Sequence, residues 1–196
     1  MFFLVFLLMK NIAIFASGSG TNAVEIIKHF QSTKSVIVSF IITNNPSAGV
    51  INKAKSLSIP SFVFSKAELD ETPTLLDFLK QNNIELIVLA GYLRKIPAHL
   101  IHAFPKAIVN IHPALLPEFG GKGMHGQGVH EAVIASQKRE SGISIHFVNE
   151  AYDEGQIIFQ EKCAVKPNDT PEILAERVLL LEHKNYAKVI ESLLKS

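Results

Sequence analysis

Asn110 and His112 are the residues of this 196-residue chain whose types and spacing most directly indicate chemistry. They end an apolar run, and residues two positions apart on a strand share one face. Two polar groups on an apolar strand cost free energy unless they are paired or used. A carboxamide can donate to a developing oxyanion, and an imidazole can exchange a proton near neutral pH. We therefore interpret Asn110 and His112 as catalytic candidates at a strand end.

An acidic turn, Asp153-Glu154-Gly155, follows a strand-like segment near the C-terminus. Asp and Gly are common turn residues, so one interpretation is turn formation alone. The functional alternative is that the turn brings Asp153 to His112, where a carboxylate favours the imidazolium and fixes its tautomer. For Glu182, composition alone indicates a solvated charge.

A glycine-rich loop, residues 17–23 (SGSGTNA), follows the first predicted strand and opens a predicted helix. Free backbone N–H groups at a helix N-terminus suit a phosphate. The spacing also matches the dinucleotide fingerprint, which expects an acidic residue about 20 positions later. That region, 43–47, reads TNNPS, so we favour a single phosphate, with Thr21 and Asn22 as donors. A tight turn without a ligand is the alternative.

A long loop is expected from Pro113 to His130, with five of the eleven glycines. Loops of this length are often functional lids. His125 and His130 lie in it, but their spacing is not that of a zinc site, and we expect no metal.

These residues need a scaffold, and the hydropathy pattern predicts an α/β fold. Near-continuous apolar runs alternate with helical patterns, which indicates a Rossmann-like, mostly parallel sheet flanked by helices. A C-terminal antiparallel hairpin over 142–149 and 156–165 is expected to extend the sheet. The other expected strands are 11–16, 35–43, 61–65, 84–90 and 107–111. The expected helices are 22–31, 49–56, 72–82, 97–104 and 171–194.

Composition narrows the function classes. Nineteen Lys and Arg against 18 Asp and Glu give a net charge of +1, which disfavours nucleic-acid binding through charge. No apolar run reaches the roughly 18 residues of a transmembrane helix. The single cysteine, Cys163, indicates a reducing compartment, and we expect a cytoplasmic protein.

The N-terminal apolar run, residues 1–9, is not preceded by a basic residue, whereas Lys10 follows it. A signal peptide carries its basic residues before the apolar run. We interpret residues 1–8 as a non-essential extension, Met9 as the natural start, and 9–196 as one domain.

Taken as an ordered set, the motifs resemble the phosphoribosylglycinamide formyltransferase family, the glycinamide ribonucleotide transformylases among the folate-dependent formyltransferases. The resemblance spans 9–194. Its motifs are 16–22 (ASGSGTN), 89–94 (LAGYLR), 110–117 (NIHPALLP), 146–148 (HFV), Asp153-x-Gly155, and Arg177-Val178 with Glu182-His183. The Asn-x-His…Asp core alone is shared by the wider formyltransferase group.

The resemblance implies formyl transfer from the co-substrate 10-formyltetrahydrofolate to the amine of glycinamide ribonucleotide in purine biosynthesis, without a metal. It implies that Asn110, His112 and Asp153 are catalytic. The implied ribonucleotide-binding residues are Gly20, Thr21, Asn22 and Glu182, the last near the amine. The implied folate-binding residues are Lys66, Leu93, Arg94, Lys95, Ile96 and Asn110. The implied partners are these two small molecules, with no nucleic acid or membrane, and the expected assembly is a monomer or weak homodimer.

The implied mechanism is direct transfer. The neutral amine attacks the formyl carbon, Asn110 and protonated His112 stabilise the oxyanion, and Asp153 keeps His112 charged and helps to move the amine proton. Lys95 departs from the family at a usually apolar position, so its side chain is expected to point outward. Residues 110–117 also resemble a segment of the wider formyltransferase group that often has a cis peptide bond. We therefore expect a cis bond at Leu116–Pro117.

Two alternatives stay open. A deformylase or sugar formyltransferase of the same group would keep Asn110, His112 and Asp153 but differ in its acceptor pocket. A non-catalytic nucleotide-binding module would keep the glycine-rich loop and have no use for the three residues together. The presence of Thr21, Asn22 and Glu182 favours glycinamide ribonucleotide as the acceptor over these alternatives.

Overall fold

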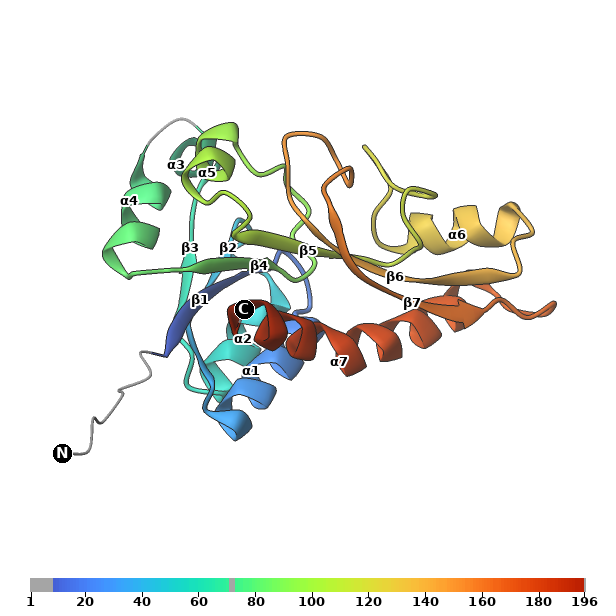
Figure 1. The fold of residues 1–196 in the computed structure, drawn as a ribbon, viewed down its shortest axis with the longest axis horizontal. Coiled ribbons are helices and arrows are strands. Elements are labelled where there is room, and N and C mark those ends of the chain that lie inside the picture. Colours follow the sequence, from blue (N-terminus) through green and yellow to red (C-terminus); the bar gives the residue numbers. More distant parts are fainter. Residues whose placement is uncertain (1–8, 71–72, 196) are drawn as a thin grey trace.

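The computed structural model describes residues 9–70 and 73–195 and contains a seven-stranded sheet with helices on both faces (Figure 1). The strand order is β3-β2-β1-β4-β5-β6-β7. Strands β1 to β5 pair in parallel, and β5, β6 and β7 pair antiparallel, which confirms the predicted fold class. The strands are β1 Lys10–Phe15, β2 Val36–Thr43, β3 Ser61–Val63, β4 Leu86–Leu89, β5 Ile108–His112, β6 Glu140–Phe147 and β7 Ile157–Ala164.

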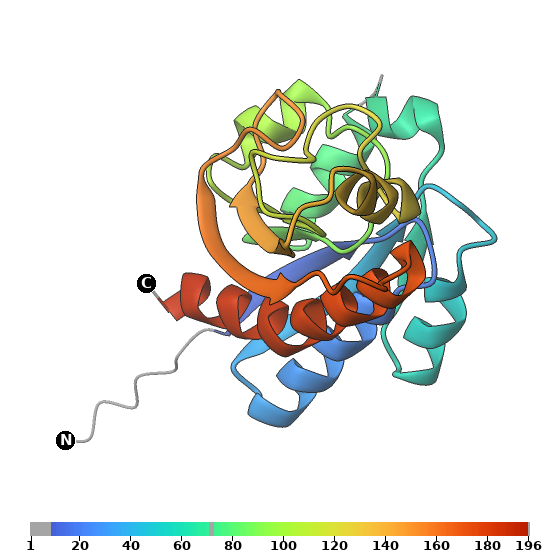
Figure 2. The ribbon, with the colours of Figure 1, turned by 90° about the vertical axis from the view of Figure 1, so that its right-hand side faces the viewer.

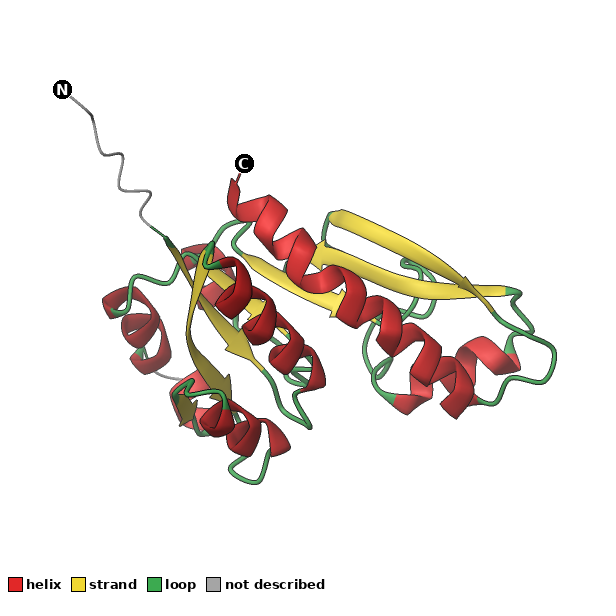
Figure 3. Cartoon of the chain, turned by 90° about the horizontal axis from the view of Figure 1, so that it is seen from below, coloured by secondary structure: helices red, strands yellow, loops and turns green. Residues whose placement is uncertain are grey.

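Two apolar clusters fill the space between the sheet and its helices. One face carries α1, α2, α6 and α7, and the other carries α3, α4 and α5. Figure 3 shows the long helix α7 crossing the sheet obliquely beside α1 and α6. The helices are α1 Thr21–Thr33, α2 Gly49–Ser56, α3 Lys66–Asp70, α4 Thr74–Gln81, α5 Ala98–Ala103, α6 Gln127–Ala135 and α7 Pro171–Lys195.

Helix α7 packs across β4 and β5. Leu174, Val178 and Tyr186 are buried at intervals of four and eight, the spacing of one helix face. The hydroxyl of Tyr186 lies 2.9 Å from the carbonyl oxygen of Leu89 and 3.2 Å from that of Val109. These contacts fix α7 beside the carboxyl end of β4 and the first residues of β5.

The prediction missed two helices. Residues 66–70 form α3, and residues 127–135 form α6, so the loop that we expected over 113–130 ends at Gly126. Gly128 masked α6 because glycine is a poor helix former, although Val129 and Val133 are buried at helical spacing. The predicted extension, residues 1–8, lies outside the described residues, and the single-domain prediction for 9–196 stays a prediction. Within the described ranges, no helix is both long and apolar enough to cross a membrane.

Three connecting segments gather on one side of the sheet. Figure 2 shows residues 90–97, 113–126 and 148–156 above the strands, with α6 beside them. All three segments contribute residues to a single cavity.

Candidate active site

A cavity of about 510 Å³ opens at the carboxyl ends of β4 and β5. This is the edge where open α/β sheets bind ligands, and the volume suits a small molecule. Most of the predicted site residues line it, namely Asn22, Leu93, Arg94, Lys95, Ile96, Asn110, His112, Asp153 and Glu182. Its described lining does not include Gly20, Thr21 or Lys66. Gly20 and Thr21 begin α1 beside Asn22, whereas Lys66 is an exposed residue at the start of α3.

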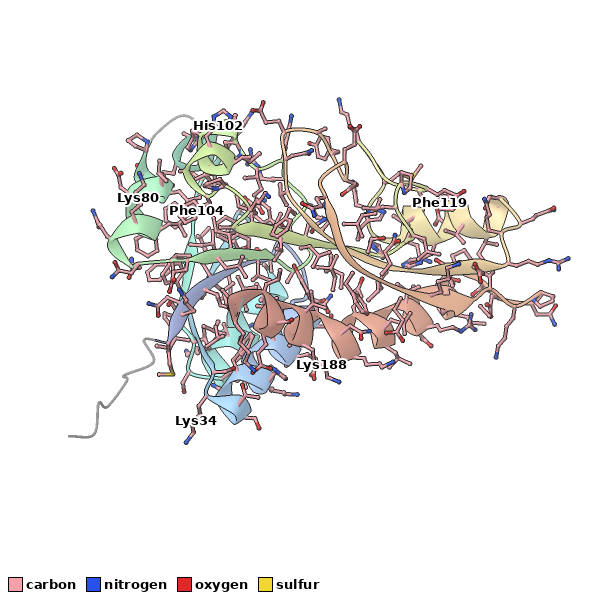
Figure 4. The ribbon with its side chains drawn as sticks, in the orientation of Figure 1. Lys34, Lys80, His102, Phe104, Phe119 and Lys188 are labelled. Atoms are coloured by element: carbon pink, nitrogen blue, oxygen red, sulfur yellow. The ribbon has the colours of Figure 1, made fainter. Side chains whose placement is uncertain are left out.

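Asn110 and His112 both face this cavity from β5, as the strand spacing predicts. His112 is 3% exposed. Its Nε2 lies 2.7 Å from the carbonyl oxygen of Phe119, the residue labelled in Figure 4. Because a carbonyl oxygen can only accept, the His112 Nε2–H donates to it.

Asp153 reaches His112 from the turn between β6 and β7. Its backbone has φ +59°, a left-handed conformation that Asp and Asn adopt more readily than most residues. The Gly121 N–H donates to Asp153 Oδ2 at 3.0 Å. Oδ2 lies 3.6 Å from His112 Nδ1, and Oδ1 lies 3.6 Å from His146 Nε2. The turn thus places one carboxylate between two imidazoles.

The charge states differ from the expectation. Burial lowers the pKa of His112, and Asp153 and the Phe119 carbonyl only partly offset it. Desolvation thus acts against the predicted protonation of His112 in the ligand-free protein, and Asp153 acts in its favour. Burial alone would raise the pKa of Asp153, but its contacts with His146, Gly121 and His112 lower it. The site thus pairs an ionised carboxylate with a neutral imidazole at neutral pH.

Glu182 lines the same cavity from α7 and is 8% exposed, so the expectation of a solvated charge is wrong. It continues the buried four-residue spacing of Leu174, Val178 and Tyr186, a signal that the sequence already carried. Asn22 Nδ2 donates to Glu182 Oε2 at 2.5 Å. Burial raises the pKa of Glu182 to about 7, although the Asn22 bond acts in the opposite direction.

The glycine-rich loop leads directly into α1. Gly20 has φ +72°, and a Cβ on it would lie 2.3 Å from Val50 Cγ2, so only glycine fits this position. The first turn of α1 carries no acidic residue, which leaves its positive end suited to an anion. Ser17 Oγ accepts a hydrogen bond from the Leu93 N–H at 3.1 Å and thereby joins this loop to the segment after β4.

The segment after β4 forms another part of the cavity wall. Ile96 is buried, whereas Leu93 is 57% exposed. Lys95 is exposed, and its Nζ lies 5.6 Å from the centre of the Tyr152 ring, a cation–π arrangement at the cavity rim.

Two buried histidines of the cavity wall had no assigned role in the sequence interpretation. His146, on β6, contacts both Asn110 and Asp153. His130, on α6, is buried with no hydrogen-bond partner at Nδ1, and burial and the nearby His112 lower its pKa.

The described residues contain no cluster of His, Cys, Asp and Glu suited to a metal ion. The Leu116–Pro117 bond is cis, as predicted.

Known proteins are similar to this chain over most of its length. Residues 10–190 match the family model described as formyl transferase. The chloroplastic phosphoribosylglycinamide formyltransferase of Arabidopsis thaliana is 46% identical over 188 residues, which are 92% of this chain and 64% of that protein. The phosphoribosylglycinamide formyltransferase of Bacillus subtilis (strain 168) is 36% identical over 193 residues, 95% of each chain. This chain spans less than two thirds of the plant relatives from Arabidopsis thaliana and Vigna unguiculata, at 64% and 61%.

Solved structures show the same architecture. The phosphoribosylglycinamide formyltransferase of Bacillus halodurans is 35% identical, with a TM-score of 0.85 over 94% of this chain and 95% of that one. Glycinamide ribonucleotide transformylase 1 of Geobacillus kaustophilus is also 35% identical, with a TM-score of 0.86 over 94% and 98%. With a family match over nearly its whole length and the Asn-x-His…Asp core assembled in one cavity, the chain belongs to the formyl transferase family.

Proposed function

We propose that this chain transfers the formyl group of 10-formyltetrahydrofolate to the amine of glycinamide ribonucleotide. The names of its relatives support this reaction, and the Bacillus subtilis relative matches over 95% of its own length. The observation that carries the proposal is that Asn110, His112 and Asp153 share one cavity with Asn22 and Glu182. The first three suit acyl transfer to an amine, and the last two supply polar groups for the acceptor.

The ribonucleotide is proposed to bind between α1 and α7. Gly20, Thr21 and Asn22 hold its phosphate, supported by the left-handed backbone of Gly20 and the positive helix end. Glu182 lies near the glycinamide amine. With a pKa of about 7, this carboxyl group can accept a hydrogen bond or a proton from an amine near neutral pH.

The folate is proposed to bind in the part of the cavity that the segment after β4 lines. Leu93, Arg94, Lys95 and Ile96 line the cavity there, and the Ile96 side chain is buried. Lys66 is proposed as a partner for an anionic end of the folate. Its exposed place at the start of α3 suits a peripheral contact and not one near the reacting atoms.

The chemistry begins with attack by the neutral amine on the formyl carbon. Asn110 donates to the oxygen, which becomes an oxyanion; one such donor is worth about 3 kcal/mol. The neutral His112 has a free lone pair on Nδ1, because its proton lies on Nε2. The amine proton moves to this nitrogen, directly or through water, and Asp153 at 3.6 Å stabilises the imidazolium that forms. Collapse of the intermediate breaks the bond from carbon to the folate nitrogen, which takes the proton from His112.

This order of proton transfers replaces the pre-formed imidazolium of the sequence interpretation. It starts from the neutral His112 that burial favours, and Asp153 acts when the charge develops. No step passes through a metal. The cytoplasmic location and the monomer or weak homodimer stay predictions.

An assay with purified chain tests the proposal. Glycinamide ribonucleotide and 10-formyltetrahydrofolate should yield tetrahydrofolate and formylated ribonucleotide in equal amounts, followed by absorbance and mass spectrometry. Formate release without any acceptor would indicate a deformylase instead. Formylation of a nucleotide-linked amino sugar in preference to the ribonucleotide would indicate a sugar formyltransferase.

A further inference from the structure

We propose that His146 is a positioning residue that orients the Asn110 amide, and that Gly155 makes room for the contact that fixes the His146 ring. This inference rests on the proposed function, in which Asn110 donates to the oxyanion. It assigns a role to two motifs, HFV at 146–148 and Asp153-x-Gly155, that the proposed chemistry otherwise leaves partly unexplained.

The register of the sheet brings the two side chains together. Asn110 on β5 and His146 on β6 are directly paired across the antiparallel ladder. Directly opposite residues project from the same face with their Cβ atoms about 5 Å apart. Both side chains therefore enter the cavity as neighbours, and His146 is 2% exposed.

The backbone sets the tautomer of His146. Its Nδ1 lies 2.9 Å from the carbonyl oxygen of Phe147, which can only accept a hydrogen bond. The proton of the neutral ring is therefore on Nδ1. The opposite nitrogen, Nε2, carries a lone pair and is an acceptor.

That acceptor determines which end of the Asn110 amide faces it. Asn110 Nδ2 lies 3.2 Å from His146 Nε2, so one amide N–H donates to the ring. The amide oxygen in that place would put two acceptors in contact. The second N–H of the same amide remains for the formyl oxygen in the cavity, so the ring keeps the donor on the reacting side.

Gly155 protects the contact that sets the tautomer. A Cβ at this position would lie 1.7 Å from the Phe147 carbonyl oxygen and 3.5 Å from His146 Nδ1. A side chain would thus displace the carbonyl that holds the ring proton. The glycine, the carbonyl, the imidazole and the amide form one chain of contacts that ends at the oxyanion donor.

The competing arrangement places the proton of His146 on Nε2 and directs it to Asp153, and the lowering of the Asp153 pKa by His146 belongs to that arrangement. The distance from Nε2 to Asp153 Oδ1 is 3.6 Å, longer than a hydrogen bond, whereas the distance to Asn110 is within range. The geometry therefore favours Asn110 as the partner, and the two arrangements make opposite experimental predictions.

Kinetics of three variants separate them. His146→Leu, which removes the acceptor, should lower kcat by roughly 30-fold, below the loss of a whole oxyanion donor, with both KM values within about 3-fold. His146→Gln, which returns an acceptor near the position of Nε2, should recover most of the rate. In an Asn110→Ala background, His146→Leu should cost less than about 2-fold, because residues that act as a unit are not additive. The same loss in both backgrounds, or full activity of His146→Leu, would overturn the inference.

A second measurement does not depend on activity or on the stability of variants. Long-range ¹H–¹⁵N spectra of the wild-type imidazoles distinguish the Nδ1–H from the Nε2–H tautomer. The Nδ1–H pattern for His146 supports the inference, and an Nε2–H pattern overturns it. A wild-type chain without formyl transfer would count against the proposed function, whereas these spectra would still decide the orientation of Asn110.

Discussion

Asn22 donates a hydrogen bond to Glu182 at 2.5 Å, although 160 positions separate them in the chain. The bond joins the first turn of α1 to the buried stripe of α7 at the cavity wall. One amide donor does not replace the water that the carboxylate loses on burial, so protonation of Glu182 stays favourable up to about pH 7.

This pair makes the stability of the fold depend on pH through Glu182. Its folded pKa of about 7 lies above the ordinary value of 4.5, so its contribution is fully present below pH 4.5 and is lost as pH rises through 7. Glu182→Gln removes the ionisation. The stability of the variant relative to wild type should therefore rise between pH 5 and pH 8, by up to roughly 3 kcal/mol. Thermal unfolding at both pH values measures it, with the exposed Glu131→Gln as control; a pH-independent difference would contradict the assignment.

Asp153→Asn isolates the charge of the turn carboxylate. Asn also tolerates the left-handed φ of +59°, so the turn and Tm should be preserved. The variant cannot stabilise the imidazolium, and we expect kcat to fall by roughly 100-fold. His112→Asn should cost at least as much, and the double variant should be much less than additive. A kcat for Asp153→Asn within a few-fold of wild type would leave Asp153 with a turn-forming role alone.

The pKa of His112 gives a second expectation for the Asp153→Asn variant. The carboxylate raises the pKa of His112 against the larger effect of burial. Its removal in Asp153→Asn should therefore shift the His112 pKa further down. Imidazole resonances followed by NMR titration measure this shift directly, and an upward shift would contradict the pairing.

The loop before α1 should affect one substrate. Replacing Thr21 and Asn22 by Ala should raise the KM for the ribonucleotide far more than that for the folate, because the loop is assigned to the phosphate. Thr21→Ala alone serves as the control, since it leaves the hydrogen bond between Asn22 and Glu182 in place. Steady-state kinetics with each substrate varied decide the matter. Equal effects on both KM values would argue against a phosphate site.

Gly155→Ala should strongly destabilise the hairpin. Its Cβ would lie 1.7 Å from the backbone carbonyl oxygen of Phe147, next to the hydrogen bond from the Phe147 N–H to the Gln156 carbonyl that closes the hairpin. Gly128→Ala is the matched control, because a Cβ there meets nothing within 4 Å and alanine favours the helix α6. We expect a clear loss of Tm in the first and none in the second. Equal Tm values for the two variants would mean that the hairpin can relax around Gly155.

The sequence predicted the sheet because its strands are continuous apolar runs, such as LIVL in β4, which lies buried on both faces. It also predicted that Asn110 and His112 point to the same side, because side chains two positions apart on a strand share one face. The neutral state of His112 could not be predicted, since it depends on how completely the distant residues around Phe119 exclude water. Glu182 was readable in principle: its spacing from Val178 and Tyr186 indicated burial, but the charge of the side chain concealed the pattern.

Because α7 is the last element of the chain, it is synthesised after the strands and turns that carry the proposed catalytic residues. Asn110, His112 and Asp153 leave the ribosome before this helix exists, so a nascent chain carries its proposed catalytic groups before it has Glu182. Until α7 docks, Tyr186 cannot reach Leu89 on β4 and Val109 on β5, and the apolar face beneath α7 is open to water or to a chaperone. The part of the cavity that holds Glu182 is thus the last part of the proposed site to be made, and a chain that stops shortly before residue 171 should expose the apolar surface that α7 covers.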